Sequence, residues 1–321
     1  KDVNKKIILP NIDNLIKLIK KEAKKYKNLV MPARTHGQKA VPTTLGKEFG
    51  VFAYRLNKYA QKLKNYEFEG KLNGAVGNYN ALALIYPSID WISKTRDFVE
   101  NLNLKWNPMT TQIEPSDSLT DYFYLLKKIN LILTGLCQDI WRYVSDDYFS
   151  FKINKSEAGS STMPQKVNPI MFENAEGNLK LANSLFDLFI NNLSVSRLQR
   201  DLSDSTLKRN FGVGMAHTVL SIKMIMSGMN LLEANKEKIT ADLNSDYTIL
   251  AEAVQLLIKK SGDDKAYELI RDLTRGQKQT EGQYLQMIEK LDVDAGLKTK
   301  LTAISPENYS GYAAKLVAKY L

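Results

Sequence analysis

Residues 159–169 read Gly-Ser-Ser-Thr-Met-Pro-Gln-Lys-Val-Asn-Pro, a polar run set between strongly helical segments. Gly159 frees the backbone, whereas Pro164 and Pro169 lack an amide donor and disfavour the helical conformation just before them. The run is therefore predicted to be a loop. Its serines, Lys166 and Asn168 are groups that can grip and deprotonate an anionic substrate.

Helical periodicity dominates the chain on both sides of this loop. Between residues 43 and 66 the apolar residues recur in steps of four and three, as in the seam of a helix packed along another helix. The same spacing recurs over 117–148, and further apolar stripes cover 179–193 and 205–232. Because strand-like alternation is almost absent, the sequence predicts an all-α fold, a bundle of long helices.

The last quarter of the chain differs from the rest, because its predicted helices are shorter. Four glycines are expected to separate them. These are Gly262, Gly276, Gly282 and Gly296. Two domains are therefore predicted, a central helical-bundle domain at 1–240 and a small helical C-terminal domain at 241–321.

Composition bounds the class of protein. With 321 residues, 44% hydrophobic and 25% charged, the chain can bury a sizeable core. Its single cysteine, Cys137, excludes an internal disulfide framework and fits a reducing, cytoplasmic compartment. No apolar run reaches membrane-spanning length, and the +10 charge comes largely from lysines scattered along helices. No membrane or nucleic-acid partner is expected.

Two histidines are present, in different settings. His36 lies at 32–38 in a polar turn expected between two helices, beside Gly37, where a histidine can exchange a proton near neutral pH. His217 lies inside an apolar helical run and is expected to be structural. Two histidines and one cysteine far apart in sequence give no metal-ligand spacing, and no dinucleotide-type glycine loop follows a strand. No metal or cofactor is expected.

Two further segments carry unusual residue patterns. Residues 70–78 contain three glycines, which suits either close approach of the backbone to a partner or a tight interhelical turn. Residues 196–209 alternate arginines with hydroxyls. Arginine forks and serine hydroxyls suit a phosphate monoester, although a solvated helix entry capped by Asp204 or Ser205 would use the same residues.

Together these segments resemble the fumarase/aspartase superfamily, and within it the adenylosuccinate lyase family. The superfamily run Gly-Ser-Ser-x-Met-Pro-x-Lys-x-Asn-Pro stands intact at 159–169. The purine branch is indicated by four shorter motifs, which are Thr-His-Gly-Gln at 35–38, Gly-Ala-Val-Gly at 74–77, Thr-Thr-Gln-Ile at 110–113 and Arg-Asp-x-Ser-Asp-Ser at 200–205. The resemblance runs from about Met31 to the C-terminus.

The resemblance implies reversible elimination of fumarate from adenylosuccinate to give AMP, and from the succinylcarboxamide intermediate of purine biosynthesis, without a cofactor. Ser160 would be the general base at carbon, with Ser161 as the fallback and a substrate contact. Lys166 would supply the nearby cation, and Asn168 would hydrogen-bond the succinyl carboxylate.

The resemblance also implies the remaining site residues. His36 would be the general acid at the departing nitrogen, oriented by Glu173, with Thr35 contacting the substrate. Gln112 would touch the carboxylate or amide side of the substrate. The nucleotide phosphate would be held by Arg200, Ser205 and Arg209, and Lys71 is a weaker candidate contact.

The same resemblance implies a homotetramer in which each active site draws on three subunits. It further implies that the family's N-terminal portion is missing, and the isolated chain is expected to be inactive for that reason. Three alternatives remain. They are another fumarate-releasing lyase such as argininosuccinate lyase, aspartase or fumarase, a non-enzymatic helical scaffold, and a nucleic-acid-binding helical protein suggested only by net charge.

Overall fold

The computed structural model describes residues 1–152 and 167–321, whose backbone contacts separate into two compact units. Each unit gathers stretches that are far apart in the sequence. The first comprises residues 1–16, 55–141 and 167–230, and the second comprises 17–54, 142–152 and 231–321.

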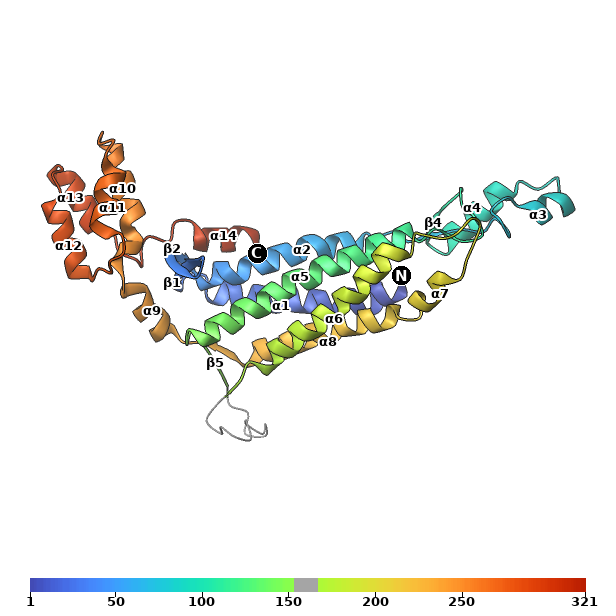
Figure 1. The fold of residues 1–321 in the computed structure, drawn as a ribbon, viewed down its shortest axis with the longest axis horizontal. Helices are drawn as coiled ribbons and strands as arrows, with labels where there is room; N and C mark the ends of the chain where they lie inside the picture. Colours follow the sequence, from blue (N-terminus) through green and yellow to red (C-terminus); the bar gives the residue numbers. More distant parts are fainter. Residues whose placement is uncertain (153–166) are drawn as a thin grey trace. The chain divides into compact units, whose positions relative to one another are not determined.

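Long helices dominate the structure, which confirms the all-α class (Figure 1). They are α1 (Leu9–Lys25), which follows a π-helical turn at Asn4–Ile8, α2 (Leu45–Lys64), α5 (Asp117–Ser145), α6 (Ile170–Asn192) and α8 (Phe211–Leu231). α2 and α5 fall within the segments 43–66 and 117–148 that the apolar spacing predicts. Pro169 directly precedes α6, where its fixed φ suits a helix start.

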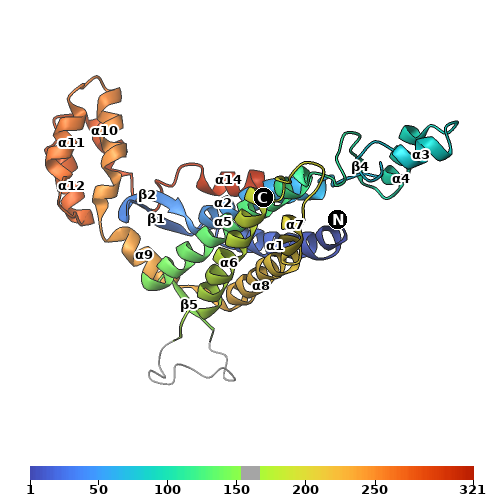
Figure 2. The same cartoon turned by 45° about the vertical axis from the view of Figure 1, so that its right-hand side comes forward.

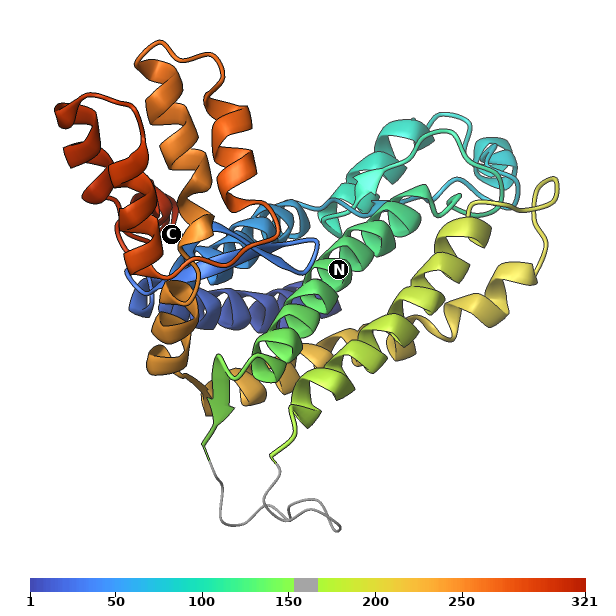
Figure 3. The same cartoon turned by 60° about the vertical axis from the view of Figure 1, so that its left-hand side comes forward.

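In the first unit, α5, α6 and α8 lie side by side (Figures 1 and 3). Phe123 of α5 joins them at one end, because its ring centroid lies 5.4 Å from that of Phe186, 5.0 Å from that of Phe189 and 4.8 Å from that of Phe211. Aromatic pairs at such distances contribute about 0.5–1.5 kcal/mol each beyond area burial. This cluster fixes one end of the bundle.

A polar layer crosses the same three helices. Asn130 of α5 is fully buried, and its Nδ2 donates to Asn183 Oδ1 of α6 at 3.0 Å and to Thr218 Oγ1 of α8 at 2.9 Å. Further along, α8 approaches α6 so closely that a Cβ on Gly228 would lie 2.7 Å from the ring of Phe172. The register of these helices is therefore set by a buried amide and by glycine at the closest approach.

Short elements complete the first unit. They are β3 (Glu69–Gly70), α3 (Asn80–Ile85), α4 (Trp91–Asn101), β4 (Lys105–Trp106) and α7 (Ser203–Lys208). β3 and β4 form a parallel pair in which Glu69 faces Lys105, whose Nζ lies 3.1 Å from Glu69 Oε1.

The second unit contains two antiparallel strand pairs. β1 (Val30–Thr35) and β2 (Gln38–Thr44) form a hairpin, and β5 (Phe149–Phe151) pairs with β6 (Leu232–Ala234). Figure 2 shows the hairpin beside α9 (Lys236–Asn244), which contacts β1.

Short helices and a hydrophobic core follow α9. They are a 3₁₀ turn at Tyr247–Leu250, α10 (Ala251–Lys260), α11 (Ala266–Thr274), α12 (Glu281–Lys290), α13 (Ala295–Thr302) and α14 (Ala313–Tyr320). Buried residues from 243 to 301, such as Leu250, Ile258 and Ile288, form one apolar cluster. α14 returns to α2, where Tyr320 meets Tyr54 edge to face at 6.3 Å.

The structure corrects three local expectations. The turn at 32–38, expected between two helices, lies within the β1–β2 hairpin, whose alternation is hidden because Pro32 and Pro42 face each other across it. The apolar segment 205–232 is broken between α7 and α8. Gly282 and Gly296 lie inside α12 and α13 rather than between helices, whereas Gly262 and Gly276 adopt the positive φ of helix-ending turns.

Among the described helices, none has the length and apolar character needed to cross a bilayer.

Candidate active site

His36 stands at the tip of the β1–β2 hairpin. Thr35 pairs with Gln38, and the two residues between them have φ values of 52° (His36) and 75° (Gly37). Two consecutive positive φ values in a two-residue loop describe a type I′ turn, which matches the right-handed twist of the strands. Histidine tolerates this left-handed region better than most side chains do. The turn therefore holds His36, with Thr35 beside it, exposed at the end of a hairpin.

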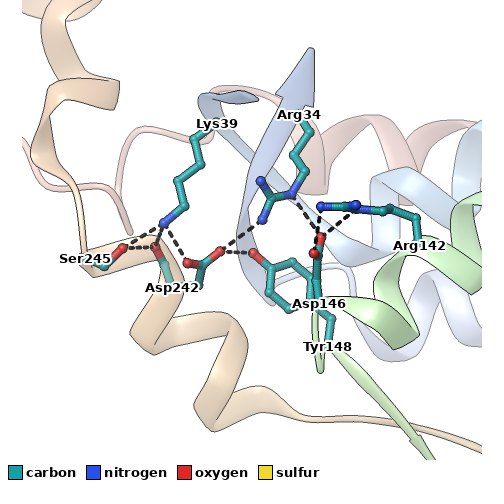
Figure 4. Close-up of polar contacts among 7 residues, drawn as sticks. All are labelled: Arg34, Lys39, Arg142, Asp146, Tyr148, Asp242 and Ser245. Atoms are coloured by element: carbon teal, nitrogen blue, oxygen red, sulfur yellow. Dashed lines mark hydrogen bonds and ion pairs between the residues drawn. The ribbon is translucent and has the colours of Figure 1, made fainter. Parts of the chain in front are cut away.

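Within the second unit, a group of seven polar residues, termed the anchor cluster, joins the base of this turn to α9 and to residues 142–148 (Figure 4). Its members are Arg34, Lys39, Arg142, Asp146, Tyr148, Asp242 and Ser245. Arg34 forks between two carboxylates, with Nε 3.1 Å from Asp146 Oδ2 and Nη2 3.4 Å from Asp242 Oδ2. Arg142 also reaches Asp146, with Nη2 2.9 Å from Oδ1.

Lys39, on β2, also contacts Asp242, which lies on α9. Its Nζ lies 2.6 Å from Asp242 Oδ1, and it donates to the Asp242 backbone carbonyl and to Ser245 Oγ, both at 2.7 Å. The Tyr148 hydroxyl donates to Asp242 Oδ2. Asp242 of α9 therefore receives groups from β1, from β2 and from the residue preceding β5.

These contacts change how two groups of the cluster titrate. Burial alone would raise the pKa of Asp242, but hydrogen bonds from Lys39 and Tyr148 and the charges of Lys39 and Arg34 hold this pKa below its ordinary value of 3.8. The ionised carboxylate therefore stabilises the fold above about pH 4, and that contribution is lost as pH falls through the lowered pKa. Burial, with the bond to Asp242, raises the pKa of Tyr148.

In the first unit, the glycine-containing segment 70–78 packs against the Thr-Thr-Gln-Ile motif at 110–113. Lys71 Nζ donates to Asn73 Oδ1 at 2.7 Å, to the Gly74 carbonyl at 3.1 Å and to the Thr111 carbonyl at 3.3 Å. Asn73 is fully buried, and its Nδ2 donates to Thr110 Oγ1 at 2.8 Å. Burial lowers the pKa of Lys71. The hydrogen bonds of its ammonium go to this segment and to Thr111. The segment approaches residues 110–111 of the same chain closely, while its approach to a bound partner stays a prediction.

We predict that Gly77→Ala destabilises this loop. A Cβ there would lie 2.0 Å from the Thr110 carbonyl oxygen, and its φ of +80° is one that L side chains rarely adopt. Such backbone strain costs about 1–3 kcal/mol, so Tm and kcat/KM are both expected to fall. Gly282→Ala in α12, where the new Cβ meets nothing within 4 Å, is the matched control. Equal Tm for the two variants would contradict the close approach.

The motif at 110–113 also touches the arginine-rich segment 196–209. The Gln112 backbone N–H donates to the Gln199 carbonyl at 3.3 Å, while the Gln112 side chain is exposed. The motif at 110–113 thus contacts Asn73 and Gln199, the residues that directly precede the motifs at 74–77 and 200–205, all in one unit.

Inside the arginine-rich segment, the acidic residues form ion pairs with the neighbouring basic side chains. Asp204 is buried on α7, with Lys208 Nζ 2.5 Å and Arg200 Nη2 3.8 Å from its carboxylate. Asp201 accepts hydrogen bonds from the side chain and backbone of Ser203, which lower its pKa to about 2. The helix-cap interpretation is wrong in detail, because α7 begins after Leu202 without a side-chain cap.

The predicted phosphate contacts remain accessible in this segment. Arg209 is exposed, and Arg200 and Ser205 are half-buried. A basic, hydroxyl-bearing surface of this kind can hold an anion such as a phosphate.

Glu173 and Asn168 lie at the start of α6. Asn168 is exposed just before the helix, and Glu173 occupies the first turn, where its Oε1 accepts a hydrogen bond from Trp141 Nε1 at 3.1 Å. The pairing of Glu173 with His36 stays a prediction. Ser160, Ser161 and Lys166 lie outside the described residues.

His217 has the structural setting expected of it, because its Nδ1 lies 2.7 Å from Asn178 Oδ1 across α6 and α8. Within residues 1–152 and 167–321, no group of three or more His, Cys, Asp or Glu side chains could hold a metal ion.

Sequence reasoning missed the supporting roles of Asn73 and Asp242, which lie outside the motifs, and of Asp204, which it weighed only as a helix cap. Asn73 and Asp204 lie within segments already singled out, and their burial is the missing signal. Asp242 lies 208 residues from Arg34 along the chain, so nothing local marks it.

Comparisons with known proteins agree with these motifs. Residues 1–183 match a family model described as Lyase, and residues 196–310 match one described as Adenylosuccinate lyase C-terminal. The adenylosuccinate lyase of Vibrio cholerae is 42% identical over 321 residues, covering 99% of this chain and 70% of that protein. The adenylosuccinate lyase of Escherichia coli K12 is 41% identical over 317 residues, with 99% and 70% covered.

Solved structures share the fold at lower identity. The crystal structure of a fumarate lyase from Mesorhizobium sp. BNC1 aligns with a TM-score of 0.73 at 18% identity, covering 98% of this chain and 71% of that one. The 3-carboxy-cis,cis-muconate lactonizing enzyme from Pseudomonas putida gives the same TM-score at 20% identity, with the same coverage. By its family matches and its relatives, the chain belongs to the adenylosuccinate lyase family of the fumarase/aspartase superfamily.

Proposed function

We propose that the complete protein eliminates fumarate from adenylosuccinate to give AMP, and from the succinylcarboxamide intermediate of purine biosynthesis. The observation that carries this proposal is the joint presence of five spaced motifs in a chain 42% identical to a curated adenylosuccinate lyase. The contacts of the motif at 110–113 with Asn73 and Gln199, which adjoin the motifs at 74–77 and 200–205, support a shared binding role for the three.

The reaction needs a base at carbon and an acid at nitrogen. A weakly acidic proton beside a carboxylate leaves, and the negative charge spreads into that carboxylate before the amine departs. Ser160 takes the proton, with Ser161 as the alternative base, because the Lys166 ammonium and loop amides can make a hydroxyl basic enough. Asn168 holds the succinyl carboxylate whose charge develops.

His36 donates a proton to the departing nitrogen, with Glu173 orienting it. Its exposed place at the tip of a hairpin leaves it accessible to a bound substrate. Positioned proton transfer supplies about 10²–10⁴-fold for each group, so electrostatic stabilisation by Lys166 and the loop must supply much of the rest.

Gln112 contacts the carboxylate or amide side of the substrate, and Thr35 contacts it near His36. Arg200, Ser205 and Arg209 hold the nucleotide phosphate. Lys71 shapes the 74–77 loop instead of binding substrate, because its three donors are engaged within the protein.

A homotetramer with shared active sites is part of the proposal. α5, α6 and α8 each leave large apolar side chains exposed at seven-residue spacing. These are Tyr124 and Leu131 on α5, Leu181 and Leu188 on α6, and Val213 and Leu220 on α8. Such stripes suit packing against helices of other copies. The single, buried Cys137 is in keeping with a cytoplasmic location.

The phosphate grip separates this function from the other fumarate-releasing lyases, which act on substrates without a phosphate. AMP is expected to inhibit the complete protein, and Arg200→Ala should raise its inhibition constant about 10- to 100-fold, since a hydrogen bond to a charged group contributes about 1.5–3 kcal/mol. Arg197→Ala is the matched control, because Arg197 is 82% exposed and pairs only loosely with Asp201, at 3.5 Å. The absence of AMP inhibition in the wild-type protein would favour argininosuccinate lyase or fumarase activity.

A further inference from the structure

The hairpin that carries His36 has an internal electrostatic problem. Arg34 and Lys39 face each other directly across the two strands, one pair below the turn. Side chains at such positions project from the same face of the pair, and like charges placed there destabilise it. A two-stranded hairpin is also marginally stable by itself. Some other group must therefore hold these strands together beneath the turn.

Asp242 is placed to do so. Its carboxylate receives Arg34 from β1 and Lys39 from β2, at 3.4 and 2.6 Å (Figure 4). The side chains of all three residues are only 18–21% exposed, so water screens the charges less than at an open surface. One carboxylate thus bridges both members of the repelling pair and offsets part of their repulsion.

The second carboxylate of the anchor cluster fixes Arg34 further. Arg34 Nε lies 3.1 Å from Asp146 Oδ2, an ion-pair contact, so carboxylates lie at two edges of the guanidinium. Lys39 is likewise held by more than one acceptor, through the α9 carbonyl and Ser245 Oγ. Arg34 and Lys39 are therefore each held by more than one contact, and Asp242 of α9 is common to both.

We propose that Asp242 is a positioning residue for His36, which it acts on by clamping Arg34 and Lys39 on either side of the turn. The inference rests on the proposed role of His36 as general acid. Asp242 itself touches no substrate. Its loss lets the like charges separate the strands and moves the imidazole away from the departing nitrogen, while the substrate-binding groups of the first unit stay in place. Proton transfer suffers more than binding does.

The test is Asp242→Asn in the complete protein, with Glu237→Gln as the matched control on the same helix, where Glu237 is exposed. Asp242→Asn is expected to lower kcat about 10- to 100-fold with KM within about threefold, since displacement by about 1 Å can cost about 10²-fold. Hydrogen–deuterium exchange over residues 30–44 should quicken in this variant alone. Wild-type kcat and exchange in Asp242→Asn would overturn the inference.

Electrostatic repair gives a readout that a merely structural role would not move. Adding Lys39→Gln to Asp242→Asn removes one of the two repelling charges, so the double variant is expected to recover part of the lost kcat and of the exchange protection. If Asp242→Asn alone fails to fold, the same measurements can be made on the double variant, because the like-charge repulsion across its hairpin has been removed. Its kcat should then lie below wild type, and a wild-type kcat would contradict the positioning role.

His36→Gln, measured in parallel, separates this inference from the proposed function. Full activity in His36→Gln would overturn both. Loss of activity in His36→Gln together with wild-type behaviour in Asp242→Asn would overturn the positioning role alone. Loss in both variants, with rescue by Asp242→Glu to within about tenfold of wild type, supports both.

Discussion

His36→Gln in the complete protein is expected to lower kcat for adenylosuccinate cleavage by about 10²–10⁴-fold, the usual contribution of a positioned general acid. The amine leaves poorly without a proton, and glutamine cannot supply one. KM should change little, because the phosphate and carboxylate contacts come from other residues. Steady-state fumarate release over a range of pH measures both quantities, and the decline of kcat at alkaline pH that a general acid produces should vanish.

The chain offers its own control for this substitution. His217→Gln removes the other histidine, whose Nδ1 meets Asn178 between α6 and α8. That variant should lose about 0.5–1.5 kcal/mol of stability while keeping kcat near wild type. A His36→Gln enzyme as active as His217→Gln would show that the proton comes from elsewhere.

Ser160→Ala is the second substitution with a large expected effect, again about 10²–10⁴-fold or more on kcat. Without its base, carbon–hydrogen cleavage becomes the slow step. A primary isotope effect with substrate deuterated at the reacting carbon should therefore be larger in the variant than in the wild type.

Ser161→Ala decides between the adjacent hydroxyls. If Ser160 is the base, Ser161→Ala weakens binding and leaves the isotope effect as in the wild type. The reverse pattern, with the large loss and the raised isotope effect in Ser161→Ala, would transfer the role to Ser161.

Apolar spacing was sufficient to predict two of the long helices. α2 and α5 appear where steps of four and three place apolar residues, and the buried Leu45, Leu56, Leu126 and Leu133 occupy those steps. Such spacing works because a helix buries one stripe against its neighbours.

The hairpin escaped prediction for a physical reason. Pro32 and Pro42 interrupt the alternation that marks a strand, and they are tolerated because a two-stranded pair has free edges. Its His36-Gly37 turn requires two positive φ values, and His-Gly is a weaker signal of this than Asn-Gly is.

The division into a bundle domain at 1–240 and a C-terminal domain at 241–321 stays a prediction.

Motif residues could be named from the sequence because the chemistry demands particular side chains at fixed local spacing. The residues that hold these motif residues in place could not be identified in the same way. Asp242 secures the His36 turn from a distant helix, and Asp204 is recognisable only through its burial between Arg200 and Lys208. Contacts across long sequence separations leave no local pattern.

The most direct test is to incubate the complete, purified protein with adenylosuccinate and to measure both products. We predict equimolar fumarate and AMP, with no release of fumarate from argininosuccinate, malate or aspartate. Fumarate produced from one of those substrates and none from adenylosuccinate would contradict the proposed function.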